Sequence, residues 1–213
     1  MDKETTRIEA FSDGVFAIAI TLLVLELKIP HESDVGEVAL STLLLRQWPA
    51  YVSFVISFAF IGIMWINHHR LFNHIKRADN TLMILNLLLL MGVTAVPFPT
   101  AILSQHLGHY DDRLAAMVFN GTYVVIALVF NLLWRYAAQE GRLLGKEWDA
   151  AAIRNISKQY AFGPLLYLVA FGLAWVSVAA SLALSFALAI FFALPPHVAA
   201  ARRDKRHGAD DRT

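Results

Sequence analysis

The longest uncharged stretch of the chain runs over residues 159–201, which contain no Asp, Glu, Lys or Arg. A helix crosses the hydrocarbon core of a bilayer with about twenty mostly apolar residues, so this stretch is too long for one span and fits two short ones. Lipid offers the backbone no hydrogen-bond partners, and segments of this kind therefore fold as membrane-spanning helices. The composition agrees: 57% of residues are hydrophobic and 16% charged, which is not typical of a water-soluble enzyme or a disordered chain.

Four further apolar segments precede this stretch. We therefore predict an all-α fold, an integral membrane six-helix bundle, in which residues 1–200 form a single six-span transmembrane domain. Residues 201–213 are expected to form a basic cytoplasmic tail. The expected spans lie at about residues 8–27, 48–66, 81–99, 114–136, 163–178 and 181–194. The third span is expected to end at the proline-containing break of residues 97–100, and residues 139–158 are expected to form a cytoplasmic linker.

The positions of the basic residues set the orientation of these spans. With the N-terminus inside, fifteen of the eighteen Lys and Arg residues fall on the cytoplasmic side, and only Lys28, Arg46 and Arg113 fall outside. Cytoplasmic segments of membrane proteins carry this excess of positive charge. The sequence thus predicts a multi-pass protein of the cell membrane with both termini cytoplasmic.

Several kinds of chemistry have no support in the sequence. Cysteine is absent, which excludes disulfides and thiolate metal sites. The G-x-S-x-G, H-E-x-x-H and Walker A patterns are absent too, so we expect no enzyme, no cofactor and no nucleic-acid partner. His68, His69 and His74 lie close together, but their spacing lacks the i, i+4 pair of a helical zinc site, and we expect no metal site there.

The first expected span carries a carboxylate inside its apolar run. Asp13 lies a few residues into the span, where a charge costs roughly 2.5–3.5 kcal/mol and so faces protein or water. It is either a buried polar tie between helices or part of an ion path. A separate apolar stripe follows steps of three and four residues, and its members are Arg7, Phe11, Gly14, Ile18, Leu22, Leu25 and Ile29. Periodicity alone favours a stripe that faces lipid.

Short motifs in the first hundred residues resemble those of a known channel family. The string Arg7-x-x-x-Phe11-Ser12-Asp13 resembles the RxxxFSD signature of the transmembrane protein 175 family, potassium channels that lack the TVGYG filter. The segment from Trp65 to His69 looks like the W-x-x-H region of that family, and Asn86 and residues 97–100 are also similar. Residues beyond the third span resemble the family mainly in topology.

This resemblance implies a role for each of these residues. In the family the first helices of the subunits line a central pore, so the stripe would face the pore, with Ile18, Leu22 and Leu25 forming stacked hydrophobic constrictions. Arg7, Ser12 and Asp13 would belong to a network at the cytoplasmic end with a histidine of the second span. His69 is the preferred histidine and His68 the second candidate; Phe11 and Trp65 complete the signature.

The expected function follows from the same resemblance. It implies a potassium-preferring cation channel that conducts passively, with K⁺ as the permeating ion and four copies of the chain around the pore in the lipid bilayer. An apolar ring dehydrates a large, weakly hydrated cation more easily than sodium. Thr21 would either add hydroxyls to the pore or bond to its own backbone, and the backbone bond is the expected state. The alternative is a proton channel or proton-coupled transporter that uses Asp13 and a span-two histidine.

Overall fold

The computed structural model describes residues 5–28, 39–145 and 150–193, and this part of the chain is helical apart from turns and short connections. The helices are α1 (Thr6–Leu22), α3 (Leu40–Arg46), α4 (Trp48–His74), α5 (Asn80–Ala95), α6 (Pro97–His106), α7 (Asp112–Ala138), α8 (Ala150–Leu173) and α9 (Val178–Ala193), with 3₁₀ turns η1 (Leu23–Glu26) and η2 (Gln139–Gly141). The predicted all-α fold is therefore confirmed.

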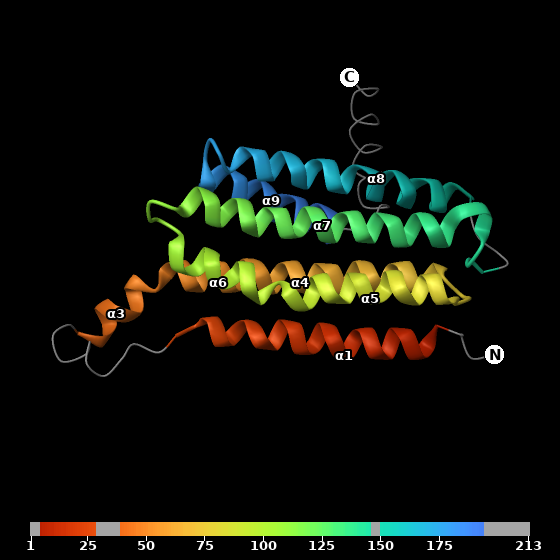
Figure 1. Ribbon diagram of the computed structural model, residues 1–213, viewed down its shortest axis with the longest axis horizontal. Coiled ribbons are helices and arrows are strands. Elements are labelled where there is room, and N and C mark those ends of the chain that lie inside the picture. The colour runs from red at the N-terminus through yellow and green to blue at the C-terminus, as the bar shows by residue number, and fades with distance from the viewer. Residues whose placement is uncertain (1–4, 29–38, 146–149, 194–213) are drawn as a thin grey trace, which may run out of the picture.

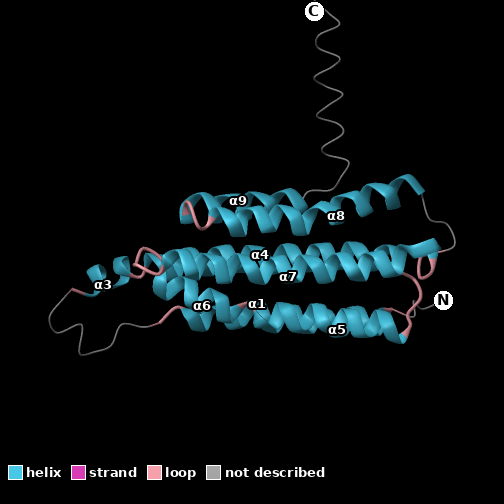
Figure 2. Ribbon diagram, turned by 45° about the horizontal axis from the view of Figure 1, so that its top comes forward, coloured by secondary structure: helices cyan, strands magenta, loops and turns pink. Residues whose placement is uncertain are grey.

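The long helices run side by side along one common direction (Figures 1 and 2). Helix α1 lies at one edge of the bundle. Among the described residues it packs mainly against α4, α5 and the η1 turn. Helix α7, in contrast, lies in the interior of the bundle, where it packs against α5, α6, α8 and α9. One helix is thus left with a large free face, and the others form the body behind it.

Four helical segments are long and apolar enough to cross a membrane. They are Thr6–Glu26, Trp48–His74, Asn80–His106 and Asp112–Gly141, and the shorter apolar helix Val178–Ala193 follows them. Helix α8 adds 24 residues between the fourth segment and α9. These helices lie where the sequence places its six spans, but several bounds differ. Helix α4, for example, runs to His74, eight residues beyond the expected end at residue 66.

The third segment does not end at the proline-containing break. Helix α5 stops at Ala95, but α6 begins at Pro97 and continues the same segment to His106. Pro97 and Pro99 occupy the first turn of α6, where a missing backbone N–H costs nothing because those donors have no helical partner. The expected end at residue 99 was therefore wrong by about two turns.

The bounds of the last two helices also differ from the prediction. Helix α8 begins at Ala150, inside the expected linker, and it ends at Leu173, before the expected residue 178. A turn over residues 174–177 follows, and the hydroxyl of Ser177 accepts a hydrogen bond from the Ala180 backbone N–H at 3.3 Å. A serine that caps the first turn of a helix marks this boundary, although neither glycine nor proline is present.

Polar side chains tie the helices together inside the apolar body. Asn120 of α7 donates to the hydroxyl of Ser181 of α9 at 2.8 Å and accepts from that of Ser185 at 2.6 Å. At the end of α4, Arg70 donates to the carbonyls of Phe192 and Ala193, the last carbonyls of α9, which lack helical partners. Such bonds fix how α9 sits on α4 and α7, where apolar packing alone permits sliding.

Candidate functional site

The stripe predicted on the first span is the free face of α1. Phe11, Ile18, Leu22 and Leu25 have exposed side-chain fractions of 57%, 60%, 43% and 69% in the single chain. Gly14 lies on the same face, and a Cβ atom added there would meet no atom within 4 Å. A free apolar face of this length is where a second copy of the chain, lipid or a pore must lie.

The opposite face of α1 is buried against the rest of the chain. Ser12, Phe16, Ala19 and Leu23 are at most 2% exposed, and they repeat at steps of three and four residues along the helix. The η1 turn keeps Leu23 on this face, while Leu25 stays on the free one. Packing against α4 and α5 therefore fixes the rotation of α1 about its own axis.

A chain of hydrogen bonds joins this buried face to α4 and α5. The Asn86 amide nitrogen donates to the Ser12 hydroxyl at 3.0 Å, and that hydroxyl donates to the Ile8 carbonyl at 2.8 Å. Nε2 of His68 lies 2.9 Å from the Asn86 carbonyl oxygen. Since an amide oxygen only accepts, Nε2 of His68 carries a proton and donates this hydrogen bond.

Aromatic rings enclose this histidine. His68 is 1% exposed, and its ring lies between Phe72, at 4.4 Å between centroids, and Phe16, at 5.4 Å. The apolar surroundings disfavour a charged imidazole and strengthen the neutral hydrogen bonds. The arrangement locks α1, α4 and α5 together at one end of the bundle.

Asp13 belongs to a second, more exposed contact. Its carboxylate accepts a hydrogen bond from the Trp65 indole N–H at 2.8 Å. The ring of His69 stacks on Trp65 with centroids 6.3 Å apart. The structure thus joins His68, the second candidate, to Ser12 through Asn86, and it places His69, the preferred histidine, beside the Trp65–Asp13 pair.

Two other signature residues stand apart from these contacts. Arg7 and Phe11 are exposed on the free face of α1, and among the described residues Arg7 has no hydrogen-bond or ion-pair partner. The structure of the single chain does not bring Arg7 into the Ser12 cluster. The Thr21 hydroxyl donates to the backbone carbonyls of Ala17 and Ile18, both at 2.9 Å, as expected for a helical threonine.

Asn86 is the member of the cluster whose role the sequence left open. It resembles a residue of the family, but no adjacent residue in the sequence indicates that His68 and Ser12 are its two partners. A side-chain amide in the middle of the apolar α5 is the available signal, because an amide in lipid must find partners on another helix. Within the described residues no group of three His, Cys, Asp or Glu side chains is arranged to hold a metal ion.

These features define a polytopic helical membrane protein whose first helix keeps a long apolar face free and is anchored by a polar cluster at one end. A family model described as "Endosomal/lysosomal potassium channel TMEM175" matches residues 7–97. The matched region holds α1, the Ser12–Asn86–His68 cluster and the Asp13–Trp65 pair.

Individual relatives extend the similarity over nearly the whole chain. A potassium channel of Chamaesiphon minutus is 54% identical over 191 residues, which are 90% of this chain and 94% of that one. The crystal structure of a lysosomal potassium-selective channel TMEM175 homolog from the same organism is 52% identical. It superimposes with a TM-score of 0.82 and covers 89% of this chain and 96% of that one. The chain therefore belongs to the TMEM175 family.

More distant relatives carry a different description. The endosomal/lysosomal proton channel TMEM175 of Bos taurus is 35% identical over 146 residues. That match covers 65% of this chain but only 30% of the bovine protein. The similarity to the bovine protein thus spans about a third of its length.

Proposed function

We propose that this chain is a potassium-preferring cation channel that conducts passively through a pore lined by α1. The observation that carries the proposal is the free face of α1, where an apolar stripe remains exposed while the opposite face is buried and hydrogen-bonded. The relatives described as potassium channels support the same function. No reaction chemistry is needed for passive conduction, and K⁺ is the permeating ion with no resident cofactor.

A pore requires several copies of this face. One chain offers one α1, and one helix encloses no channel. Four copies arranged around an axis with closed symmetry would bring their stripes together around a central path. We therefore infer a homotetramer in the lipid bilayer, with α4 to α9 of each subunit on the outside of the ring of α1 helices.

The constriction lies at Ile18, Leu22 and Leu25. These side chains follow one another along the free face of α1 and its η1 turn. Apolar rings gate a pore by expelling water, and they impose a dehydration cost on each passing ion. This cost is lower for potassium than for the more strongly hydrated sodium, which gives the preference without a TVGYG filter. We infer that both termini are cytoplasmic, because most Lys and Arg residues then lie on that side, and that the channel lies in the cell membrane.

A planar bilayer recording tests this function. The purified protein is recorded with potassium on one side and sodium on the other, and the current should reverse toward the potassium equilibrium potential. A current that reverses at zero contradicts the potassium preference. Absence of current together with pH-driven uptake in liposomes from the same preparation contradicts the passive channel.

The second candidate is proton conduction or proton-coupled transport. Its support is the description of the bovine relative as a proton channel, together with Asp13, which lies exposed beside Trp65 and His69. A reversal potential that follows the proton gradient, when potassium is equal on both sides, favours this candidate. Loss of that current in Asp13→Asn would assign the proton path to the carboxylate.

A further inference from the structure

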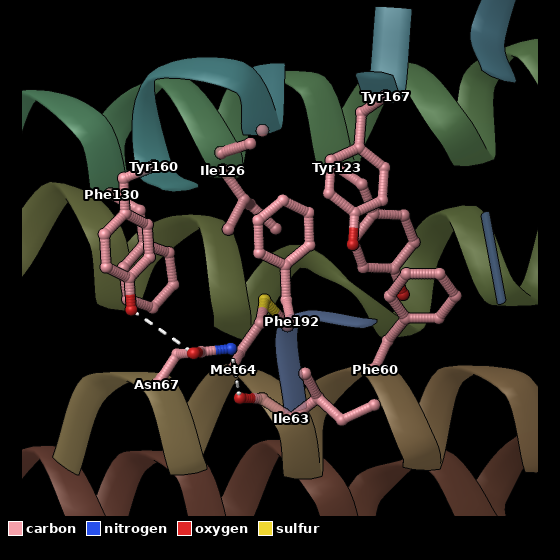
Figure 3. Close-up of a pocket in the computed structure, with 12 residues that line it drawn as sticks. Phe60, Ile63, Met64, Asn67, Tyr123, Ile126, Phe130, Tyr160, Tyr167 and Phe192 are labelled. Carbon is pink, nitrogen blue, oxygen red and sulfur yellow. Dashed lines mark hydrogen bonds between the residues drawn. The ribbon is translucent and has the colours of Figure 1, made fainter. Parts of the chain in front are cut away.

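A cavity lies inside each subunit, on the side of α4 that faces away from α1 (Figure 3). Helices α4, α7, α8 and α9 line it, and its volume is about 60 Å³. A single buried water needs about 10–15 Å³ of such space, so the cavity has room for roughly four to six non-hydrogen atoms. It is separate from the α1 face and from the Ser12 cluster.

Three tyrosines line the cavity, and only one of them has its hydroxyl paired. Tyr160 donates to the Asn67 side-chain oxygen at 3.2 Å, and the Asn67 amide nitrogen donates to the Ile63 carbonyl at 3.0 Å. The Tyr123 hydroxyl is buried and interacts with the Ser57 side chain of α4, but it makes no hydrogen bond of ordinary geometry. The Tyr167 hydroxyl has no hydrogen-bond partner among the described residues. An unpaired buried hydroxyl costs about 1–3 kcal/mol, which a ligand with a polar group would relieve.

The aromatic rings that carry these two hydroxyls lie side by side. The rings of Tyr123 and Tyr167 stack with centroids 6.3 Å apart, and Phe60 stacks on Tyr123 at 4.2 Å. Figure 3 shows this group at one end of the cavity and the Asn67–Tyr160 pair at the other, with Phe192 between them. The unpaired polar groups are therefore concentrated at one end of an otherwise apolar space.

The rest of the wall selects the class of ligand. Apart from the tyrosine hydroxyls and Asn67 it is made of aromatic and aliphatic groups, and no Asp, Glu, Lys or Arg of the described residues lines it. A charged ligand would pay a large desolvation cost without a counter-charge, whereas a purely apolar one would leave both hydroxyls unpaired. A small neutral molecule with a hydroxyl and a short apolar body would both hydrogen-bond to the tyrosine hydroxyls and pack against the apolar side chains.

We propose that this cavity is a binding site for small neutral amphiphiles of the short-alcohol class, held by the hydroxyls of Tyr123 and Tyr167. The apolar body lies against Phe192 and Ala127, and the ligand hydroxyl donates to one tyrosine while it accepts from the other. Water fills the site when no such molecule is present. The site does not depend on conduction, because it lies behind α4 and not on the α1 face.

The test uses 2-bromoethanol, whose bromine can be located by its anomalous scattering. Crystals of the intact protein are soaked with it, and a bromine peak is expected between α4, α7, α8 and α9. Ala127→Leu fills the cavity and should abolish the peak, whereas Ala180→Leu adds the same volume on an exposed position of α9 and should leave it. Tyr167→Phe should lower the bromine occupancy several-fold at a fixed, subsaturating concentration.

A smaller change guards against misfolding of the leucine variant. In Gly163→Ala the new methyl group lies 3.5 Å from the Phe192 ring, an ordinary contact, and it should reduce the occupancy. Absence of bromine from the wild-type cavity overturns the proposal. Equal occupancy in wild type and in both Tyr123→Phe and Tyr167→Phe overturns it as well, since the cavity would then be a purely apolar void.

Discussion

The side-chain amide of Asn131 donates a hydrogen bond to the backbone carbonyl of Tyr160 at 2.8 Å. This carbonyl lies four residues before Pro164, which is inside α8 and has no backbone N–H to offer it. A residue of α7 thus supplies the donor that the proline removes from α8. The Tyr160 carbonyl therefore keeps a hydrogen-bond donor inside the apolar body, where an unpaired carbonyl is costly.

Asn131→Leu should destabilise the protein by about 1–3 kcal/mol, because it leaves the Tyr160 carbonyl buried without a donor. Pro164→Ala restores an N–H at the helical position, so the loss in Asn131→Leu should be smaller on that background. Unfolding of the detergent-solubilised protein measures the four members of this double-mutant cycle. Strict additivity of the two changes would show that Asn131 does not act through this carbonyl.

The Ser12–Asn86–His68 chain should contribute more to stability than the neighbouring His69. Asn86→Leu keeps the volume but removes the amide, so the buried Nε2 of His68 loses its acceptor at a cost of about 1–3 kcal/mol. The Ser12 hydroxyl loses one donor and keeps its bond to the Ile8 carbonyl. His69→Ala is the control, since His69 is exposed. Thermal unfolding should show a large loss for the first variant and a small one for the second; equal losses contradict the assignment of the cluster to His68.

Ile18→Asn should reduce discrimination between potassium and sodium. An amide at the constriction offers water and ions a polar partner, which lowers the apolar barrier and the difference in dehydration cost. A loss of about 0.5–1.4 kcal/mol in that difference reduces the permeability ratio roughly two- to tenfold. The reversal potential in a mixed potassium–sodium gradient measures it, with Ile18→Val as the control. An unchanged reversal potential argues against Ile18 as the constriction.

Asp13→Ala should lower the yield of the tetramer that we propose. The change removes the carboxylate that accepts a hydrogen bond from the Trp65 indole N–H. This hydrogen bond joins α1 to α4. Trp65→Phe keeps the ring and removes only the donor, so it should reproduce the effect in part. Size-exclusion chromatography with light scattering gives the assembled fraction. A stable, fully conducting tetramer of Asp13→Ala would show that the carboxylate is dispensable.

The Asp79–Tyr136 contact predicts a pH dependence of stability. The Tyr136 hydroxyl donates to the Asp79 carboxylate at 2.6 Å, and this bond, with that from the Leu82 backbone N–H, lowers the pKa of Asp79 below its ordinary value of 3.8. A lowered pKa means that the ionised group stabilises the fold above the unfolded-state pKa and that this stabilisation is lost as the pH falls through the folded-state pKa.

Tyr136→Phe should therefore be less stable than wild type near neutral pH, and the two melting temperatures should converge as the pH falls below about 4. Asp79→Asn is a matched control. It keeps the side-chain oxygen that caps α5 but cannot titrate, so its difference from the Tyr136→Phe, Asp79→Asn double variant should not depend on pH in this range. A wild-type advantage that grows at acid pH would contradict the assignment.

The helical membrane fold and the apolar stripe of α1 could both be predicted from the order of the residues. Apolar runs of about twenty residues become helices in lipid because each backbone group must be bonded within its own segment. The 3.6-residue period then puts Ile18, Leu22 and Leu25 on one side whatever the neighbouring helices do. For this reason the stripe is where periodicity predicts it, and the RxxxFSD resemblance identifies the same family as the comparisons.

The contacts between side chains of different helices could not be predicted in the same way, because they depend on how the helices pack. His68 and His69 are adjacent on α4, but they point about 100° apart, and the packing of α4 against α1 and α5 turns His68 toward Asn86. The continuation of the third segment through Pro97, the Asn131 donor for the Tyr160 carbonyl, and the cavity beside Tyr167 depend likewise on neighbours distant in the chain. Helix periodicity is local, whereas hydrogen-bond partners between helices are set by how whole helices rotate and slide against one another.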